Sequence, residues 1–254
     1  MSNPAVTPQA AASAVEPGLS EGARIVNTFT TPTKTFTDLK RKPSWFVPFI
    51  LLCGFSYALI FAAAQKIGWE QITENQMRMN HKRMEQIENM PAEQQASARE
   101  LGVKITKGFS YGFPIVLLVV VVIVSAVLMA IFNFGLGAEI TFSQSLAVNM
   151  YARLPGIIKV VLAVISIYAG AAPENFIFQE PVASSLGALV DPAQHLVLFS
   201  FLSYFDVFAI WILILSGIGY SCVSKVKRGT AIGVLAGCYL LWILLQTGVA
   251  TLAA

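Results

Sequence analysis

Charged side chains are scarce in this sequence: Asp, Glu, Lys and Arg together make up 12% of its 254 residues. A soluble domain carries about 25% of such residues. Hydrophobic residues make up 56% of the chain, and its mean hydropathy is +0.66. The scarcity of charge therefore argues against an ordinary soluble domain and favours a protein embedded in a lipid bilayer.

Cysteine is also rare. The three cysteines, Cys53, Cys222 and Cys238, lie in or beside apolar runs, and the two long polar segments contain none. This distribution argues against a disulfide framework and against a zinc site, so we expect no metal site. Basic residues form no run of the kind that binds nucleic acid, and we expect no nucleic-acid partner.

Short motifs of common catalytic and cofactor sites are missing as well. The chain has no nucleophile elbow, zinc-protease helix, phosphate-binding loop or dinucleotide-binding loop. Ser216 and His195 could suggest an intramembrane serine protease, but along one straight helix they lie roughly 30 Å apart. We therefore expect no catalytic residue, no cofactor and no enzymatic activity.

Long hydrophobic runs are what the sequence does contain. A helix needs about 20 apolar residues to cross a hydrocarbon layer roughly 30 Å thick. Five runs are long enough, and none shows the strict alternation of a membrane-barrel strand. We therefore predict an all-α polytopic membrane protein, with transmembrane helices over about residues 45–65, 112–134, 142–170, 203–223 and 230–252.

A polar segment, residues 66–111, separates the first two runs. Its pattern predicts a helix, a break at Met90 and Pro91, and a second helix, because Pro91 followed by Glu93 is a good helix start. Residues 44–254 are thus expected to form a five-helix membrane domain with a helical insertion outside the membrane.

Lysine and arginine near the short loops predict the orientation. They precede the first span and fill the link between the last two: Lys40, Arg41, Lys42, Lys225, Lys227 and Arg228. The connection 171–195 carries acidic residues but neither Lys nor Arg. Because such cations stay on the cytoplasmic side, we expect a cytoplasmic N-terminus and an outside C-terminus. Segment 66–111 then lies outside despite its mixed charge, since charge has a weaker influence on whether a long loop is translocated across the membrane.

The N-terminal part divides in two. Residues 1–19, rich in Ala, Pro and Ser, predict a disordered tail. Residues 20–43 predict two short helices, since Ser20 can cap one and Pro32 can start another. Their apolar face and basic residues favour an amphipathic segment on the inner-leaflet surface. A sharper alternative makes residues 20–42 a docking site for a membrane or cytoplasmic protein.

One carboxylate, Asp206, interrupts the fourth run. Counted from Lys225 it lies about 28 Å along a helix, close to the full hydrocarbon thickness, so it can sit at the outer interface. Ser203 and Asp206 also have the spacing of a capping box. We therefore expect Asp206 to start the fourth span rather than to form a central ion site.

Two cations and a proline interrupt the third run. Pro155 should kink the helix. Arg153 then lies near mid-depth. It bonds the carbonyls freed at the kink, extends to the inner surface, or lines a polar cavity. Lys159 is expected to extend toward the outer surface. Arg153, Pro155, Lys159 and Asp206 are the candidate intramembrane polar residues.

Small residues recur in the fifth run. Gly229, Gly233 and Gly237 form a GxxxGxxxG face, which lets helix backbones approach closely in lipid. The partner helix can belong to the same chain or to another copy, so a homo-oligomer is one expectation.

Three stretches resemble bacterial members of the Yip family, named for proteins that interact with yeast Rab-type GTPases. They are FTTPTKTFTDLKRKPSWFVPF, FSQSLAVNMYARLPGIIKVVL and LSYFDVFAIWILILSGIGYSCVSKVKRGTAIGVLAGCYLLWILL. The resemblance implies five spans, a cytoplasmic N-terminus, no catalytic residues and a bacterial inner membrane. Rab binding is not implied, because the DLYGP-type motif of the eukaryotic relatives is missing.

Two functions follow from these observations. The first is a non-enzymatic membrane protein that organises membrane or recruits partners. The alternative is a small permease or channel component with a polar cavity around Arg153.

Overall fold

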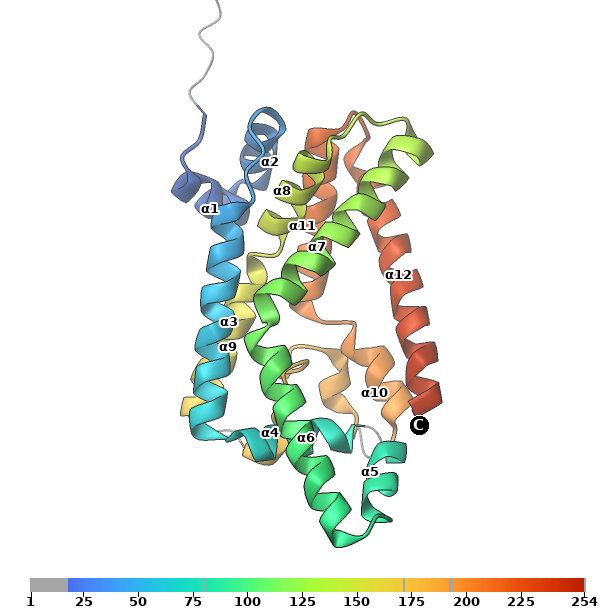
Figure 1. The fold of residues 1–254 in the computed structure, drawn as a ribbon. Coiled ribbons are helices and arrows are strands. Elements are labelled where there is room, and N and C mark those ends of the chain that lie inside the picture. The colour runs from blue at the N-terminus through green and yellow to red at the C-terminus, as the bar shows by residue number, and fades with distance from the viewer. Residues whose placement is uncertain (1–17, 80, 171, 192–193, 254) are drawn as a thin grey trace, which may run out of the picture.

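The computed structural model describes residues 18–79, 81–170, 172–191 and 194–253, and most of the expected tail at 1–19 lies outside them. The regular secondary structure in these ranges is helical, and one isolated β-bridge pairs Ser185 with Asp206. The predicted all-α class is confirmed. Long helices run side by side along the height of the molecule, with short helices at both ends (Figure 1).

Four stretches in the described residues are long and apolar enough to cross a membrane: Phe46–Lys66, Phe113–Gly135, Phe142–Tyr168 and Arg228–Val249. The first is α3 (Phe46–Lys66), the second joins α7 (Phe113–Ala130) to a π-helical turn (Ile131–Gly135), and the last lies in α12 (Arg228–Ala253). α11 (Val207–Val223) is apolar but has 17 residues. It is about 25 Å long, just under the hydrocarbon thickness. The protein is thus polytopic, and five crossings stay a prediction.

The third stretch is broken at the expected place. α8 (Phe142–Ala152) ends before Arg153, and α9 (Pro155–Tyr168) begins with Pro155 at its first position. Proline suits that position because it has no backbone N–H to donate. The other end of α8 has a full capping box, in which Thr141 and Gln144 bond each other's backbone N–H groups.

The described residues of segment 66–111 form three helices: α4 (Trp69–Arg78), α5 (His81–Glu88) and α6 (Ala92–Tyr111). The predicted break at Met90 and Pro91 separates α5 from α6, but the single helix expected before that break is two helices, α4 and α5. Arg99 of α6 bonds Glu74 of α4 at 2.9 Å. Asn75 donates to the carbonyls of Pro173 and Phe176 at 2.8 and 2.9 Å, which ties α4 to the connection after α9. These helices lie opposite α1 and α2, and we call this the hairpin end (Figure 1).

The N-terminal segment forms α1 (Glu21–Thr30) and α2 (Pro32–Arg41), which cover the other end of the bundle, the capped end (Figure 1). Ser20 caps α1, as predicted. The expected membrane-surface placement of the apolar face is wrong for α2, whose Phe36 and Leu39 are fully buried in the protein core. Gly219 of α11 permits this contact, because a Cβ there would lie 3.0 Å from the Phe36 ring.

Candidate functional site: a charged cavity at the hairpin end

Asp206 is the residue before α11, and it caps that helix. Its backbone is extended, and its Oδ1 atom accepts hydrogen bonds from the N–H groups of Phe208 and Ala209 at 2.9 and 3.0 Å. The prediction that Asp206 starts a helix is confirmed. The helix begins at Val207, a few residues after the expected start near Ser203, and a separate short helix, α10 (Leu196–Ser203), precedes it.

The second oxygen of Asp206 faces Lys159. The Nζ atom of Lys159 lies 3.0 Å from Asp206 Oδ2 and 3.8 Å from Glu180 Oε2. The expected extension of Lys159 to the outer surface is therefore wrong, since its side chain is only 18% exposed. Two carboxylates hold the ammonium inside the protein at lower cost than a lone buried charge.

The connection after α9 brings Glu180 to this pair. Val207 donates to the carbonyl of Ser184, and Leu186 donates to that of Phe205, so the connection is bonded to the start of α11. The Ser184 hydroxyl also donates to Asp206. Sequence reasoning missed Glu180. A buried Lys needs a carboxylate, but the acidic residues of that connection, Glu174, Glu180 and Asp191, were equal candidates.

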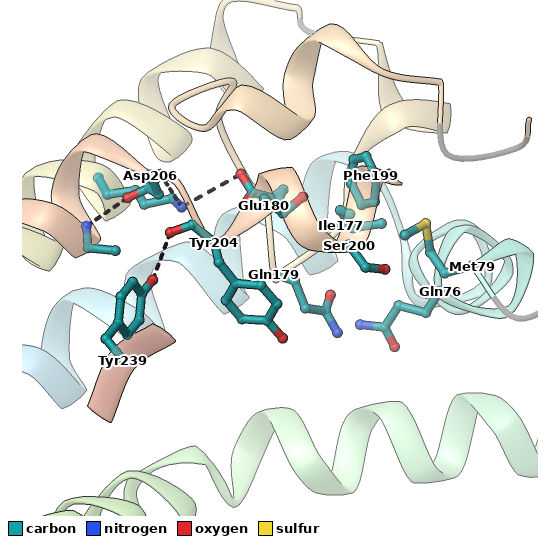
Figure 2. Close-up of a pocket in the computed structure, with 13 residues that line it drawn as sticks. Gln76, Met79, Ile177, Gln179, Glu180, Phe199, Ser200, Tyr204, Asp206 and Tyr239 are labelled. Carbon is teal, nitrogen blue, oxygen red and sulfur yellow. Dashed lines mark hydrogen bonds and ion pairs between the residues drawn. The ribbon is translucent and has the colours of Figure 1, made fainter. Parts of the chain in front are cut away.

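A cavity of about 410 Å³ opens at this cluster. Figure 2 shows the side chains of Tyr204, Gln179 and Gln76 below those of Asp206 and Glu180, in the view drawn there. Met79, Ile177, Phe199, Ser200, Ser203, Ala209 and Tyr239 complete the lining. The site therefore combines three charged side chains with amides, hydroxyls and aromatic rings, and its residues come from the helices α4, α9, α10, α11 and α12 and from the connections between them.

The cavity lies at the depth of the apolar helices. Tyr239 of α12 lines it and donates a hydrogen bond to the Tyr204 carbonyl at 2.7 Å. Tyr239 is about 17 Å along α12 from Arg228, well within a hydrocarbon layer roughly 30 Å thick. Ionisable groups at such depth usually mark a functional site.

Arg153 and Pro155 do not line this cavity. Arg153 is half-buried, and its side chain makes no hydrogen bond or ion pair with the described residues, although it interacts electrostatically with Tyr220. Within the described residues, Arg153 therefore neither bonds carbonyls freed at the kink nor lines this cavity, and its extension to the inner surface stays a prediction. The polar cavity forms around Lys159 instead, because the connection after α9 brings carboxylates there.

A second polar cluster lies buried between α7, α8 and α11. The Asn149 amide donates to Ser125 Oγ at 3.0 Å and to the Tyr220 hydroxyl at 2.9 Å, and Tyr220 also bonds Ser145. Sequence reasoning missed this cluster. The available signal was the four-residue spacing of Ser145, Asn149 and Arg153, which places them on one face of a helix.

The three glycines of α12 make no close helix contact within the described chain. A Cβ at Gly229, Gly233 or Gly237 would have nothing within 4 Å. The close approach between α11 and α12 lies at Gly217 instead, where a Cβ would be 2.4 Å from Ile232 Cγ1 and 3.0 Å from its Cα. The described residues therefore supply no closely packed helix at these three glycines, and a homo-oligomer stays a prediction.

A family model described as the Yip1 domain matches residues 26–250. The chain belongs to the Yip1-domain family. No curated protein and no solved structure matches it. As a Yip1-domain protein with several apolar helices, it is an integral membrane protein in contact with lipid. The matched region contains α2, every candidate span and all the residues of the cavity.

The capped end of this Yip1-domain protein is built around a buried arginine. Arg24 is 2% exposed, and its Nη2 atom lies 2.7 Å from Asp38 Oδ2. Arg24 also bonds Glu21 at 2.9 Å and the Ser44 hydroxyl at 3.0 Å, and the Tyr151 hydroxyl donates to Glu21. These bonds fix α1 and α2 to each other and to α8.

The same network sets the acidity of its carboxyl groups. Burial acts to raise the pKa of Asp38, but hydrogen bonds from Arg41 and Arg24 outweigh it and hold that pKa below its usual value. For Glu21, burial likewise acts to raise the pKa, but hydrogen bonds from Tyr151, Ser44 and Arg24 outweigh it and hold the pKa below its usual value. Both carboxylates are thus stabilised in their charged forms.

Proposed function

We propose that this Yip1-domain protein is a non-enzymatic protein of the bacterial inner membrane that recruits a cytoplasmic partner with an acidic surface through its capped end. The N-terminus lies in the cytoplasm and the C-terminus outside. The positive residues around the capped end support this orientation, since the positive-inside rule places them on the cytoplasmic side.

The observation that carries the proposal is an exposed basic surface made by two distant parts of the chain. α2 and the link between α11 and α12 lie together, because Arg228 donates to the Thr33 hydroxyl at 3.1 Å. Their exposed cations are Lys34, Lys40, Arg41, Lys42, Lys225, Lys227 and Arg228. We call these residues the basic surface.

The burial of the apolar side of α2 favours a protein partner over insertion into lipid. Phe36 and Leu39 are already covered by the bundle, so this helix has no large apolar face left to place in a membrane. The bonds of Arg24 hold the backbone beneath the basic surface in place. A partner therefore meets a preorganised surface and loses little entropy in ordering it.

In-cell photocrosslinking tests this function. A photoreactive amino acid replaces the exposed Thr37 of α2, and crosslinked partners are identified by mass spectrometry. Combining Lys34→Glu, Lys40→Glu and Lys227→Glu should reduce the crosslink to an acidic protein by about tenfold, because the charge complementarity is reversed. Lys104→Glu, an exposed reversal on α6, is the matched control and should leave it unchanged. Crosslinks to this chain alone contradict the proposal.

A second candidate function, a small permease, is favoured by the charged cavity at the hairpin end. The buried cluster of Ser125, Ser145, Asn149 and Tyr220 adds polar groups between the cavity and the capped end. Light scattering by proteoliposomes tests glycerol, ammonium chloride and sodium acetate as solutes. Flux through wild type that is lost in Lys159→Met, at a temperature where thermal unfolding shows this variant to be folded, supports transport. Flux no greater than that of empty liposomes contradicts it.

A further inference from the structure

The charges of the cavity do not balance. Its ionisable lining consists of one cation, Lys159, and two carboxylates, Glu180 and Asp206, together with the phenols of Tyr204 and Tyr239. With the carboxylates ionised and the phenols neutral, the lining has one net negative charge. Burial raises the pKa of Glu180, so either a proton on this carboxyl group or a monovalent cation in the cavity restores neutrality.

Glu180 is the carboxylate with the weaker contacts, since Lys159 lies 3.8 Å from it and Ser185 is a further polar neighbour that favours its charged form. Both oxygens of Asp206 are engaged, one by two backbone N–H groups and the other by Lys159 and Ser184. Glu180 Oε2, in contrast, is buried, has no hydrogen bond within the described part of the chain, and lies 3.8 Å from Lys159. A buried carboxylate oxygen without a hydrogen bond is costly, and an ammonium ligand in the cavity would compensate the charge of that group.

The remaining lining suits an organic cation better than a metal ion or an anion. Phe199, Tyr204 and Tyr239 provide aromatic faces, which attract ammonium groups. No group of three or more potential metal ligands was found in the described residues. An anion would have to compete with two carboxylates for Lys159.

We propose that this cavity binds an ammonium group, carried by a small soluble amine or by the head group of an aminophospholipid. The volume of about 410 Å³ admits a ligand the size of ethanolamine or choline. A lipid head group can reach the cavity because the cavity lies at the depth of the apolar helices. Apolar side chains of α12 next to Tyr239 are also exposed, and they include Leu240, Leu241 and Trp242. This inference concerns the hairpin end and does not depend on partner recruitment at the capped end.

The ligand test uses the full-length protein and probes of matched shape. Isothermal titration measures ethanolamine and choline, with the neutral choline isostere 3,3-dimethylbutan-1-ol as the shape control. Native mass spectrometry of nanodiscs compares phosphatidylethanolamine with phosphatidylglycerol. Saturable binding of either soluble ammonium compound supports a soluble source, and selective retention of phosphatidylethanolamine alone supports a lipid source.

Two variants then test whether ammonium binding depends on the surplus negative charge of the cavity. Glu180→Gln keeps the shape of the side chain, and it should weaken ammonium binding about tenfold. Glu174→Gln, an exposed change in the same connection, is the matched control and should bind like wild type. Thermal unfolding confirms that both variants are folded. Equal binding of the neutral isostere, unchanged binding by Glu180→Gln, or no binding of any ammonium probe overturns the proposal.

Discussion

The Lys159 ammonium lies 3.0 Å from the Asp206 carboxylate, and this contact joins α9 to the residue that caps α11. Both side chains are largely buried, at 18% and 7% exposure. One ion pair therefore connects two apolar helices inside the protein, where a lone charge would be costly.

Breaking this pair should destabilise the protein. Lys159→Met leaves Asp206 charged and buried, which should lower the free energy of unfolding by about 3 kcal/mol. Thermal unfolding in detergent measures the effect. In a double-mutant cycle with Asp206→Asn, the second change should cost less in the Lys159→Met background than in wild type. Lys104→Met, at an exposed pair on α6, is the control. Equal stability of Lys159→Met and wild type would contradict the structural role.

Replacing Gly217 or Gly233 by Ala should have opposite effects on the stability of the protein. At Gly217 the new Cβ meets the backbone of Ile232 at 3.0 Å, so Gly217→Ala should cost about 1–3 kcal/mol through overpacking. At Gly233 nothing lies within 4 Å, so Gly233→Ala should preserve or raise the thermal stability through its better helix propensity. Equal losses at both positions would show that the α11–α12 contact is wrong.

A bulkier substitution at Gly233 tests whether the protein forms an oligomer. If another copy packs on the GxxxGxxxG face, the bulky change Gly233→Leu should block the close helix approach. Light scattering of the detergent-solubilised protein should then report a smaller particle than wild type while the unfolding midpoint is retained. An unchanged mass would mean that this face contacts lipid.

Acid should loosen the capped end. The pKa values of Asp38 and Glu21 are lowered in the folded state, so their stabilising contribution is complete above their unfolded values, about 4. The contribution is lost as the pH falls through the lowered folded values. Hydrogen exchange of α1 and α2 should therefore accelerate below pH 4, after correction for the intrinsic rate. Asp38→Asn should be less stable at neutral pH and should lose much of this pH dependence, and an unchanged pH profile in that variant would count against the Arg24 network.

Arg153 and Asn149 lie one helical turn apart but should behave differently. Arg153 has no hydrogen bond or ion pair with the described residues, so Arg153→Met should not lower the unfolding midpoint. Asn149→Leu removes three hydrogen bonds and should cost about 2 kcal/mol or more. A large loss of stability in Arg153→Met would reveal a partner that the structure lacks.

Apolar periodicity and length predicted the membrane helices well, because these features arise within one segment. The break at Pro155 and the cap at Asp206 were also predictable, since proline and a helix-starting carboxylate act locally. The residues that contact Lys159 and Phe36 could not be predicted in this way. Glu180 reaches Lys159 through a connection without regular structure, and Phe36 is buried because Gly219, far along the chain, leaves room for it. Such contacts depend on tertiary packing, which one chain segment does not encode.

The two-ended arrangement, with the basic surface in the cytoplasm and the charged cavity toward the outside, is tested most directly by side-specific labelling. Cys53, Cys222 and Cys238 are first replaced by Ser, and Thr37→Cys on α2 or Ser97→Cys on α6 then supplies one exposed thiol. A membrane-impermeant maleimide is added to intact spheroplasts. Ser97→Cys should react at once, and Thr37→Cys only after permeabilisation. Reaction of Thr37→Cys in intact spheroplasts would contradict the orientation and the recruitment of a cytoplasmic partner.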